Sequence, residues 1–149
     1  MMSLLWKDKK LAWTNELSVG NAVIDAEHKN LISMVNDVAH AIKTRDCSAL
    51  AHAFEILESW LHVHFMNEEQ IALAAKFDFS KHKAKQQYGL KELRHMRDEL
   101  VGKGGVWSDG TVDHFTKSLK HWMIDKHIIE LDMQMKPVLQ GYPYDFMPA

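Results

Sequence analysis

Residues 50–75 read LAHAFEILESWLHVHFMNEEQIALAA, and their apolar side chains recur in alternating steps of four and three. This spacing places one set of side chains on a single face of a long α-helix, which neither glycine nor proline interrupts. The face consists of Leu50, Phe54, Leu57, Leu61, His64, Glu68, Ile71 and Ala75. A histidine and a carboxylate therefore stand in a stripe that should be apolar if the helix packs in a core.

Three further segments carry a stripe of the same kind, and each stripe includes a histidine. The first, at about 21–43, consists of Ile24, His28, Leu31, Val35, Val38 and Ile42. The next, at about 80–101, consists of His82, Gln86, Gly89, Leu93, Met96 and Leu100. The last consists of Phe115, Leu119, Trp122, Ile124, His127, Leu131, Met135 and Val138. Four amphipathic helices predict an all-α fold, an antiparallel up-down-up-down four-helix bundle.

Polar residues between the stripes predict where the helices begin. Asp46 or Ser48 can cap the second helix by accepting hydrogen bonds from its free backbone amides. Ser80 and Thr111 are the expected caps of the third and fourth helices. Because these connections are short, consecutive helices should be antiparallel neighbours.

The chain is expected to form one domain over residues 1–149. Its parts would be an irregular N-terminal arm at 1–20, the bundle at 21–140 and a non-helical tail at 141–149, which contains two prolines. The arm has no helical periodicity, and its tryptophans, Trp6 and Trp13, are expected to pack on the bundle.

Composition excludes several classes of function. With 149 residues, of which 46% are hydrophobic, the chain can bury a core without covalent cross-links. Eighteen basic and twenty acidic residues without a run of like charge argue against nucleic-acid and membrane-surface binding. No apolar run approaches the roughly twenty residues of a transmembrane helix. Cys47 is the only cysteine, which excludes a disulfide framework and a thiolate metal cluster and favours a cytoplasmic location.

The four stripe histidines, His28, His64, His82 and His127, indicate a metal site. A single histidine on an apolar face is usually a core residue that is hydrogen-bonded to a backbone carbonyl. Burying several imidazoles and carboxylates without partners, however, costs roughly a few kcal/mol each, and one bound metal would compensate the whole set. Imidazole and carboxylate ligands suit iron, zinc, copper or manganese, and the ligand type alone does not choose among these metals.

One known class of bundle metal site does not match. Ferritin-like di-iron proteins use two Glu-x-x-His motifs and a glutamate from each remaining helix. The single match here, Glu92 to His95, lies off the stripe, so both residues are expected on the surface. The other histidines that miss the stripes are also expected there: His40, His52, His62, His114 and His121.

The fourth helix offers two carboxylates near its histidine. His127 and Asp132 are five residues apart, about 140° in an ideal helix, so they converge only if the helix is locally bulged or the site lies between them. Geometry alone also permits Glu130. Asp132 shares the stripe of Ile128 and Met135, which favours Asp132.

At this point the chain resembles the bacterial hemerythrins over nearly its whole length. The matching residues are Trp13, Leu17, Ser18, Val19, Gly20, Ile24, Asp25, His28, His64, Phe65, Glu68, Glu69, His82, Trp122, His127, Ile128 and Asp132. The resemblance implies a bundle that encloses two non-heme irons bridged by an oxo or hydroxo group. It also implies that dioxygen binds reversibly at one iron as a peroxide.

Carried over residue by residue, the resemblance implies a ligand set. His28 and His64 would hold the iron that meets oxygen, and His82 and His127 would belong to the second iron. The carboxylates that bridge both irons would be Glu68 and Asp132.

Four further residues are expected to lie near the ligands without binding the metal. Phe65 and Trp122 are expected to wall the oxygen pocket. Asp25 is expected to act as a favourable charge at a helix N-terminus, with a role behind the ligands as the alternative. Glu69 is expected to face water.

Gln86 departs from the family pattern, which has a second histidine four residues after the one at His82. His95 cannot substitute, because nine residues place it about half a turn away from Gln86. Gln86 could coordinate weakly through its amide oxygen, hydrogen-bond a water that completes the iron, or do neither. Each choice leaves the second iron more open, which should favour autoxidation, small-anion binding or peroxide chemistry over long-lived oxygen storage.

The resemblance implies a protein that carries, stores or delivers dioxygen, performs no net reaction and meets an unidentified redox or delivery partner. One alternative is an enzyme or scavenger that turns over peroxide, nitric oxide or oxygen at the opened iron. Another is a sensor whose oxidation changes a partner surface, although 149 residues leave no room for an output domain. A fourth possibility is a degenerate site that holds one iron, zinc or nothing.

Overall fold

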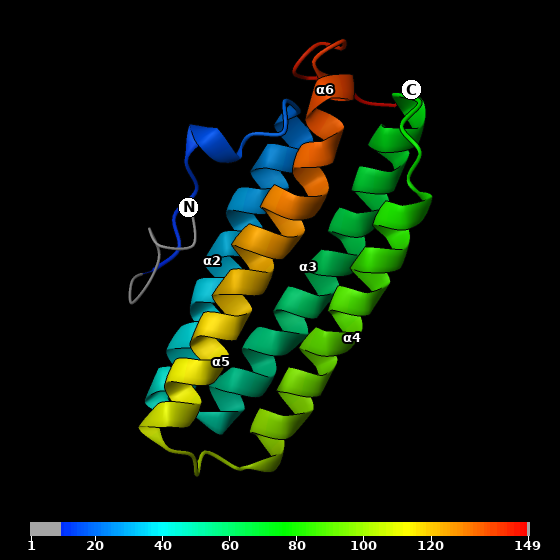
Figure 1. Ribbon diagram of the computed structural model, residues 1–149. Helices are drawn as coiled ribbons and strands as arrows, with labels where there is room; N and C mark the ends of the chain where they lie inside the picture. Colours follow the sequence, from blue (N-terminus) through cyan, green and yellow to red (C-terminus); the bar gives the residue numbers. More distant parts are fainter. Residues whose placement is uncertain (1–9, 149) are drawn as a thin grey trace.

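The computed structural model describes residues 10–148, and within that range it contains helices but no strand. Four long helical segments stand side by side and alternate in direction (Figure 1). The first three are α2 Ala22–Thr44, α3 Cys47–Ala74 and α4 Ser80–Gly102. The fourth consists of α5 Asp109–His121, the π-helix η2 Trp122–Leu131, the 3-10 helix η3 Asp132–Met135 and the short helix α6 Lys136–Leu139. The expected antiparallel four-helix bundle is thereby confirmed.

Each predicted stripe faces the interior of the bundle. In α3 the whole stripe is buried, its histidine and its carboxylate included. Met96, Trp122 and Val138 are only half-buried, because they pack against the core from its edge. Leu90, which the stripe of α4 omitted, is buried in the core.

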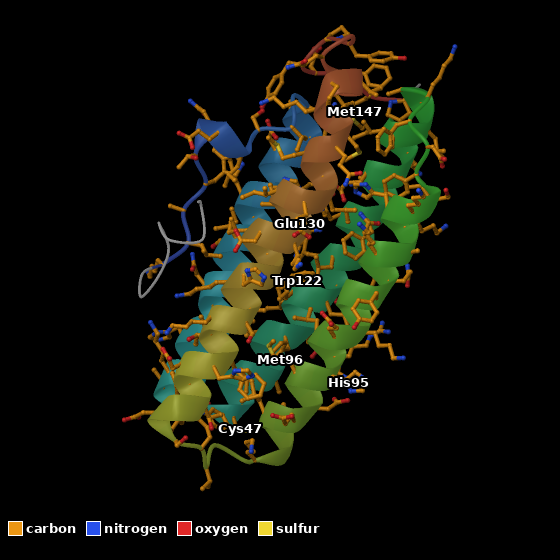
Figure 2. All side chains as sticks on the ribbon, in the orientation of Figure 1. Cys47, His95, Met96, Trp122, Glu130 and Met147 are labelled. Carbon is orange, nitrogen blue, oxygen red and sulfur yellow. The ribbon has the colours of Figure 1, made fainter. Side chains whose placement is uncertain are left out.

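The turn between α2 and α3 follows the expected chemistry. Arg45 adopts a left-handed conformation with φ 55°, and Asp46 Oδ1 then accepts a hydrogen bond of 3.1 Å from the Ala49 amide. Of the two expected caps, Asp46 and Ser48, the structure therefore uses Asp46. Cys47 is the first residue of α3, and Figure 2 shows it at the end of the bundle opposite Met147.

The expected caps of the other two helices are wrong. Ser80 is the first residue of α4, and its amide and hydroxyl donate to Asp78 Oδ1 over 3.1 and 2.8 Å. Thr111 lies within the first turn of α5, where its amide donates to Ser108 Oγ over 3.1 Å. In both cases an acceptor two or three residues upstream takes the free amide, so the helix begins earlier than predicted.

The core is divided into two hydrophobic clusters. The larger cluster includes Leu31, Leu61, Leu93 and Ile128, and the smaller one includes Ile24, Ile71, Phe79 and Met135. Along every helix a buried polar residue separates the two clusters, namely His28, Glu68, His82 or Asp132. A layer of polar side chains therefore crosses the bundle near the end where α2 and α4 begin.

The arm and the C-terminal tail are fastened to this end of the bundle. Asp25 is buried, and it accepts hydrogen bonds from Ser18 Oγ (2.5 Å), the Val19 amide (2.9 Å) and Tyr144 Oη (2.8 Å). The expected role of Asp25 as a favourable charge at a helix N-terminus is therefore incomplete, because its carboxylate also ties three segments together.

The arm is irregular apart from the 3-10 turn η1 Asn15–Leu17. Trp13 packs against the larger cluster, and Lys29 Nζ lies 4.4 Å from its ring centroid. Trp6 falls outside the described residues. Across residues 10–148, no helix combines the length and the apolar character needed to cross a bilayer.

Candidate metal centre

Four imidazoles and two carboxylates meet in the polar layer. Each of the four helical segments supplies at least one of them, and each side chain is at most 4% exposed: His28 from α2, His64 and Glu68 from α3, His82 from α4, His127 from η2 and Asp132 from η3. The structure thus brings together every histidine and carboxylate that the sequence proposed as a ligand.

Asp132 lies at the centre of the group. Its Oδ2 is 2.7 Å from His28 Nε2 and 3.1 Å from His127 Nε2, whereas its Oδ1 is 2.7 Å from His82 Nε2. One carboxylate is therefore contacted by imidazoles from three helical segments, and its two oxygens face different histidines.

Glu68 occupies the opposite side of the group. Its Oε1 is 3.1 Å from His64 Nε2 and accepts a hydrogen bond of 2.8 Å from Gln86 Nε2. Its Oε2 is buried without a hydrogen-bond partner and lies 3.6 Å from His28 Nε2. In addition, His64 Nε2 and His127 Nε2 face each other at 3.1 Å.

This arrangement fits a bound cation. One ligand atom from each of five residues, His28, His64, Glu68, His127 and Asp132, lies within 4.8 Å of all the others. The buried oxygen of Glu68 that lacks a donor would gain a partner if a metal bound there. Nitrogen and oxygen donors of this kind suit iron as well as zinc, copper and manganese. His82 stands outside this compact set and reaches it through Asp132.

The π-helix η2 explains how His127 and Asp132 converge. Hydrogen bonds from residue i to residue i+5 bring side chains five positions apart towards the same side of the helix. The sequence left two possibilities, a local bulge or a site between the two residues; the structure shows the irregular helix, since η2 ends at Leu131, directly before Asp132. Glu130 is exposed and pairs with Lys126 at 3.3 Å.

Burial and charge act against each other on these groups. Burial lowers the pKa of His127 to about 3, which keeps this imidazole neutral and its lone pair free for a metal. Burial also opposes protonation of His64, but the charge of Glu68 and the nearby carboxylates of Asp132 and Glu27 raise the pKa of His64 well above 6.5. Burial would raise the pKa of Asp132, but the surrounding imidazoles hold it well below its usual value. Protons and a metal thus compete for the same nitrogens.

A carboxylate behind the ligands was missed by the sequence reasoning. Glu27 Oε1 accepts a hydrogen bond of 2.8 Å from His64 Nδ1, and Asn67 Nδ2 donates to Glu27 Oε2 over 2.5 Å. This contact fixes the ring so that Nε2 points towards the centre. The only signal in the sequence was that Glu27 precedes the stripe residue His28. This position does not show that its side chain reaches α3.

Aromatic rings flank two of the imidazoles. Phe79 stacks on His82 with ring centroids 4.6 Å apart and an interplanar angle of 24°. Trp122 stacks on His127 at 5.8 Å and 22°, and Phe65 lies 5.6 Å from the same ring. The rings of Phe79 and Trp122 restrict how the two imidazoles can turn.

A pocket of about 570 Å³ opens between α4 and η2. Phe65, Trp122 and Leu131 form its apolar walls, and Gln86 and His127 line it where it meets the polar layer. The expected wall residues Phe65 and Trp122 thus line a pocket beside the centre. A Cβ atom on Gly89 would lie 2.7 Å from Trp122 Nε1, so glycine is what lets the indole approach α4.

The remaining expected surface residues lie on the surface. The exposed histidines are His40, His52, His62, His95, His114 and His121, and Figure 2 shows His95 on the outer side of α4. Glu92 is exposed as well. Glu69 is partly exposed and pairs with Lys83 at 3.2 Å.

Comparisons with known proteins agree with one another. Residues 19–139 match the family model of the hemerythrin HHE cation binding domain. A bacteriohemerythrin of Pseudomonas aeruginosa (strain LESB58) is 27% identical over 135 residues, covering 78% of this chain and 88% of the relative. A bacteriohemerythrin of Stenotrophomonas maltophilia (strain R551-3) is 26% identical over 88 residues, covering 58% of each chain. A crystal structure of a hemerythrin mutant has the same fold, with a TM-score of 0.72 and 21% identity over 87% of this chain and 96% of that one.

Proposed function

Because the chain belongs to the hemerythrin HHE cation-binding family, we propose that it binds two irons in the polar layer and dioxygen at that centre. The observation that carries this proposal is the layer itself: four imidazoles and two carboxylates, all buried, with an orphaned carboxylate oxygen among them. The protein would carry, store or deliver dioxygen and perform no net reaction.

The proposed ligand assignment is the one that the resemblance to the family implies. His28 and His64 would hold the iron that meets dioxygen, and His82 and His127 the second iron. Asp132 suits a bridging role, because Oδ2 contacts His28 and Oδ1 contacts His82.

Glu68 is the second proposed bridge. Its Oε1 contacts His64 Nε2 and its Oε2 has no hydrogen-bond partner, so each oxygen would be available to a different iron. The two carboxylates and four imidazoles would thereby hold both irons from all four helical segments.

The bound iron pair would supply reversible electron transfer to dioxygen, while the chain controls the surroundings. Phe65 and Trp122 present apolar surface beside His127, and the larger hydrophobic cluster closes one side of the layer. Glu27 holds His64 in the tautomer that presents Nε2 to a metal. Apolar surroundings limit the water and protons at the centre, which would favour reversible binding of dioxygen over its reduction.

Gln86 supports a second candidate function. It donates to Glu68 instead of offering an imidazole nitrogen, so the second iron would have one protein ligand fewer than the family pattern. An additional exchangeable position would admit small anions, nitric oxide or peroxide. On this reading the protein is a redox or gas sensor or a peroxide scavenger with the same two irons.

Anaerobic loading with ferrous iron, followed by repeated addition and removal of oxygen, tests the proposal. We expect two irons per chain and a visible absorption that appears with oxygen and disappears when oxygen is removed. Irreversible conversion to a ferric spectrum would favour the sensor or scavenger function. Absence of any such band would contradict the di-iron assignment.

Two carboxylate variants of the fourth helical segment form a matched pair, one that tests the proposed site and one that serves as its control. Asp132→Ala should abolish the absorption and lower the iron content, because it removes the residue that contacts three imidazoles. Glu130→Ala should leave both unchanged, since Glu130 faces solvent two residues away.

A further inference from the structure

The pocket between α4 and η2 is larger than a diatomic ligand requires. Its volume of about 570 Å³ falls within the range of about 300–1,000 Å³ that is usual for organic ligands. Water, which is comparable in size to dioxygen, occupies only about 30 Å³ of liquid. The volume therefore points to a ligand with a carbon skeleton.

The walls of the pocket select the shape of such a ligand. Trp122 presents a flat indole that is held against α4 at Gly89 and stacked on His127. Phe65 and Leu131 supply further apolar surface. Flat aromatic walls favour an offset-stacked aromatic ring.

The rim of the pocket selects the charge of the ligand. Lys85 and Lys126 are matched by Glu92 and Glu130, and Lys126 pairs with Glu130 at 3.3 Å. Two cations and two carboxylates leave the rim without a net charge. Neither an anion nor a cation is favoured, so the ligand should be neutral.

The inner end of the pocket offers one hydrogen-bond acceptor. Gln86 is only 3% exposed, and its Nε2 is engaged with Glu68 Oε1. From residues 10–148, no hydrogen bond reaches Gln86 Oε1. A ligand that carries a hydroxyl donor would satisfy this oxygen.

We propose that this pocket binds a neutral phenol or hydroquinone. The aromatic ring stacks on Trp122 between Phe65 and Leu131, and the hydroxyl donates to Gln86 Oε1. The ligand then lies beside His127, on the side of the centre where the chain departs from the family pattern. This proposal goes beyond oxygen binding, and it does not require a metal.

Ligand-observed saturation-transfer NMR with the full-length chain tests the proposal, in the metal-free form and again after loading with diamagnetic zinc. Phenol is the probe, toluene lacks its hydroxyl, and benzoate adds a negative charge. We expect phenol to bind in both forms and to bind at least about tenfold more tightly than either analogue.

Variants of α4 locate the binding site. Ala84 is exposed and lines the pocket, so Ala84→Leu should fill the mouth and weaken phenol binding at least about tenfold. Gln87→Leu is the matched control, because Gln87 is exposed on the same helix and does not line the pocket. Gln86→Leu should reduce phenol binding to the level of toluene.

Three outcomes would overturn the proposal. Equal binding of phenol and toluene would mean that the phenol hydroxyl does not donate a hydrogen bond to Gln86 Oε1. Tighter binding of benzoate would indicate an anion site. Binding that Ala84→Leu and Gln87→Leu leave equally intact would place phenol elsewhere. Each result is independent of the oxygen experiment, so failure of one proposal does not imply failure of the other.

Discussion

Gln86 is the residue that most distinguishes this centre. Its amide is buried and donates to Glu68 Oε1, so it supports a carboxylate ligand instead of providing an imidazole. A neutral amide is a weaker metal ligand than an imidazole, which leaves the proposed second iron less shielded. The rate of oxidation in air should therefore depend on this one side chain.

Gln86→His should lengthen the lifetime of the ferrous protein in air. An added imidazole would occupy the position that is otherwise open to water or anions, and we expect autoxidation to slow by about tenfold or more. The lifetime is measured from the growth of the ferric absorption after exposure to air. Gln87→His, at the exposed neighbouring position, should have no effect. An unchanged lifetime in Gln86→His would refute the role of the open position.

Glu27 would act on a bound metal only through His64, whose Nδ1 donates to it. Glu27→Ala removes the acceptor of the His64 Nδ1 hydrogen bond, and we expect metal affinity to fall by about 10- to 100-fold. Glu27→Gln keeps an acceptor without the charge and should recover part of the loss. Competition with a chelator measures the affinity. Glu55→Ala, which changes an exposed glutamate of α3, should behave like the natural protein; an equal loss there would remove the case for Glu27.

The residues of the polar layer could be predicted from the sequence because their polar side chains interrupt apolar stripes. His28 and Glu68 replace residues that helical periodicity requires to be hydrophobic, and such a substitution is visible in one sequence. Glu27 lies off the stripe, where a carboxylate is ordinary. Its role depends on the rotation of α2 against α3, which periodicity does not determine.

At the scale of the helix, η2 is the element that shapes both the centre and the pocket. Its π-helical turns bring His127 and Asp132 towards the same side and hold Trp122 against α4 at Gly89. The spacing of five between His127 and Asp132 required either a local irregularity or a site between the two residues. It could not predict that the irregular stretch would run from Trp122 to Leu131 or that α6 would follow it, because these lengths depend on packing against the other helices.

Gly89→Ala tests the close approach of η2 to α4. The new Cβ would lie 2.7 Å from Trp122 Nε1, so the indole must shift, and we expect a loss of about 1–3 kcal/mol in the free energy of unfolding. Gly102→Ala in the same helix meets no atom within 4 Å and should be neutral or stabilising by up to about 1 kcal/mol. Urea denaturation measures both. If the two variants were equally stable, the indole would not be tightly held.

At the scale of the whole molecule, Asp25 joins the arm, α2 and the tail. Tyr144 Oη donates to Asp25 Oδ2 over 2.8 Å, and partial burial together with this contact raises the pKa of Tyr144 above 10.0. A raised pKa means that the folded state favours the protonated phenol. The stabilisation is therefore complete below pH about 10 and is lost as pH rises through the raised value.

Tyr144→Phe should accordingly lower the free energy of unfolding by about 1 kcal/mol at neutral pH. The difference from the natural protein should shrink as the phenol ionises at alkaline pH. Denaturation curves between neutral and alkaline pH measure it. Tyr142→Phe is the control, because within residues 10–148 the Tyr142 hydroxyl makes no hydrogen bond; a loss of the same size in both variants would mean that Asp25 is not the cause.

The polar layer lies between a larger and a smaller hydrophobic cluster. This division of the core predicts how the protein responds to removal of a metal. The smaller cluster has eight buried hydrophobic residues among residues 10–148, against twenty-two in the larger one, and without a metal the layer beneath it keeps an unpartnered buried carboxylate oxygen, Glu68 Oε2. Leaving this oxygen without a partner costs about 1–3 kcal/mol. The end of the bundle above the layer should therefore open without unfolding of the larger cluster.

Hydrogen exchange with and without metal tests this division of the bundle. A metal that binds only the closed state adds about 2.7 kcal/mol of protection at a concentration a hundredfold above its dissociation constant. After chelation we expect the largest increase in amide exchange around the smaller cluster, at 22–26, 70–75 and 134–139. Amides at 54–61 and 90–97, beside the larger cluster, should continue to exchange only through global unfolding. A uniform increase along all four helical segments would show instead that the two clusters unfold as one unit.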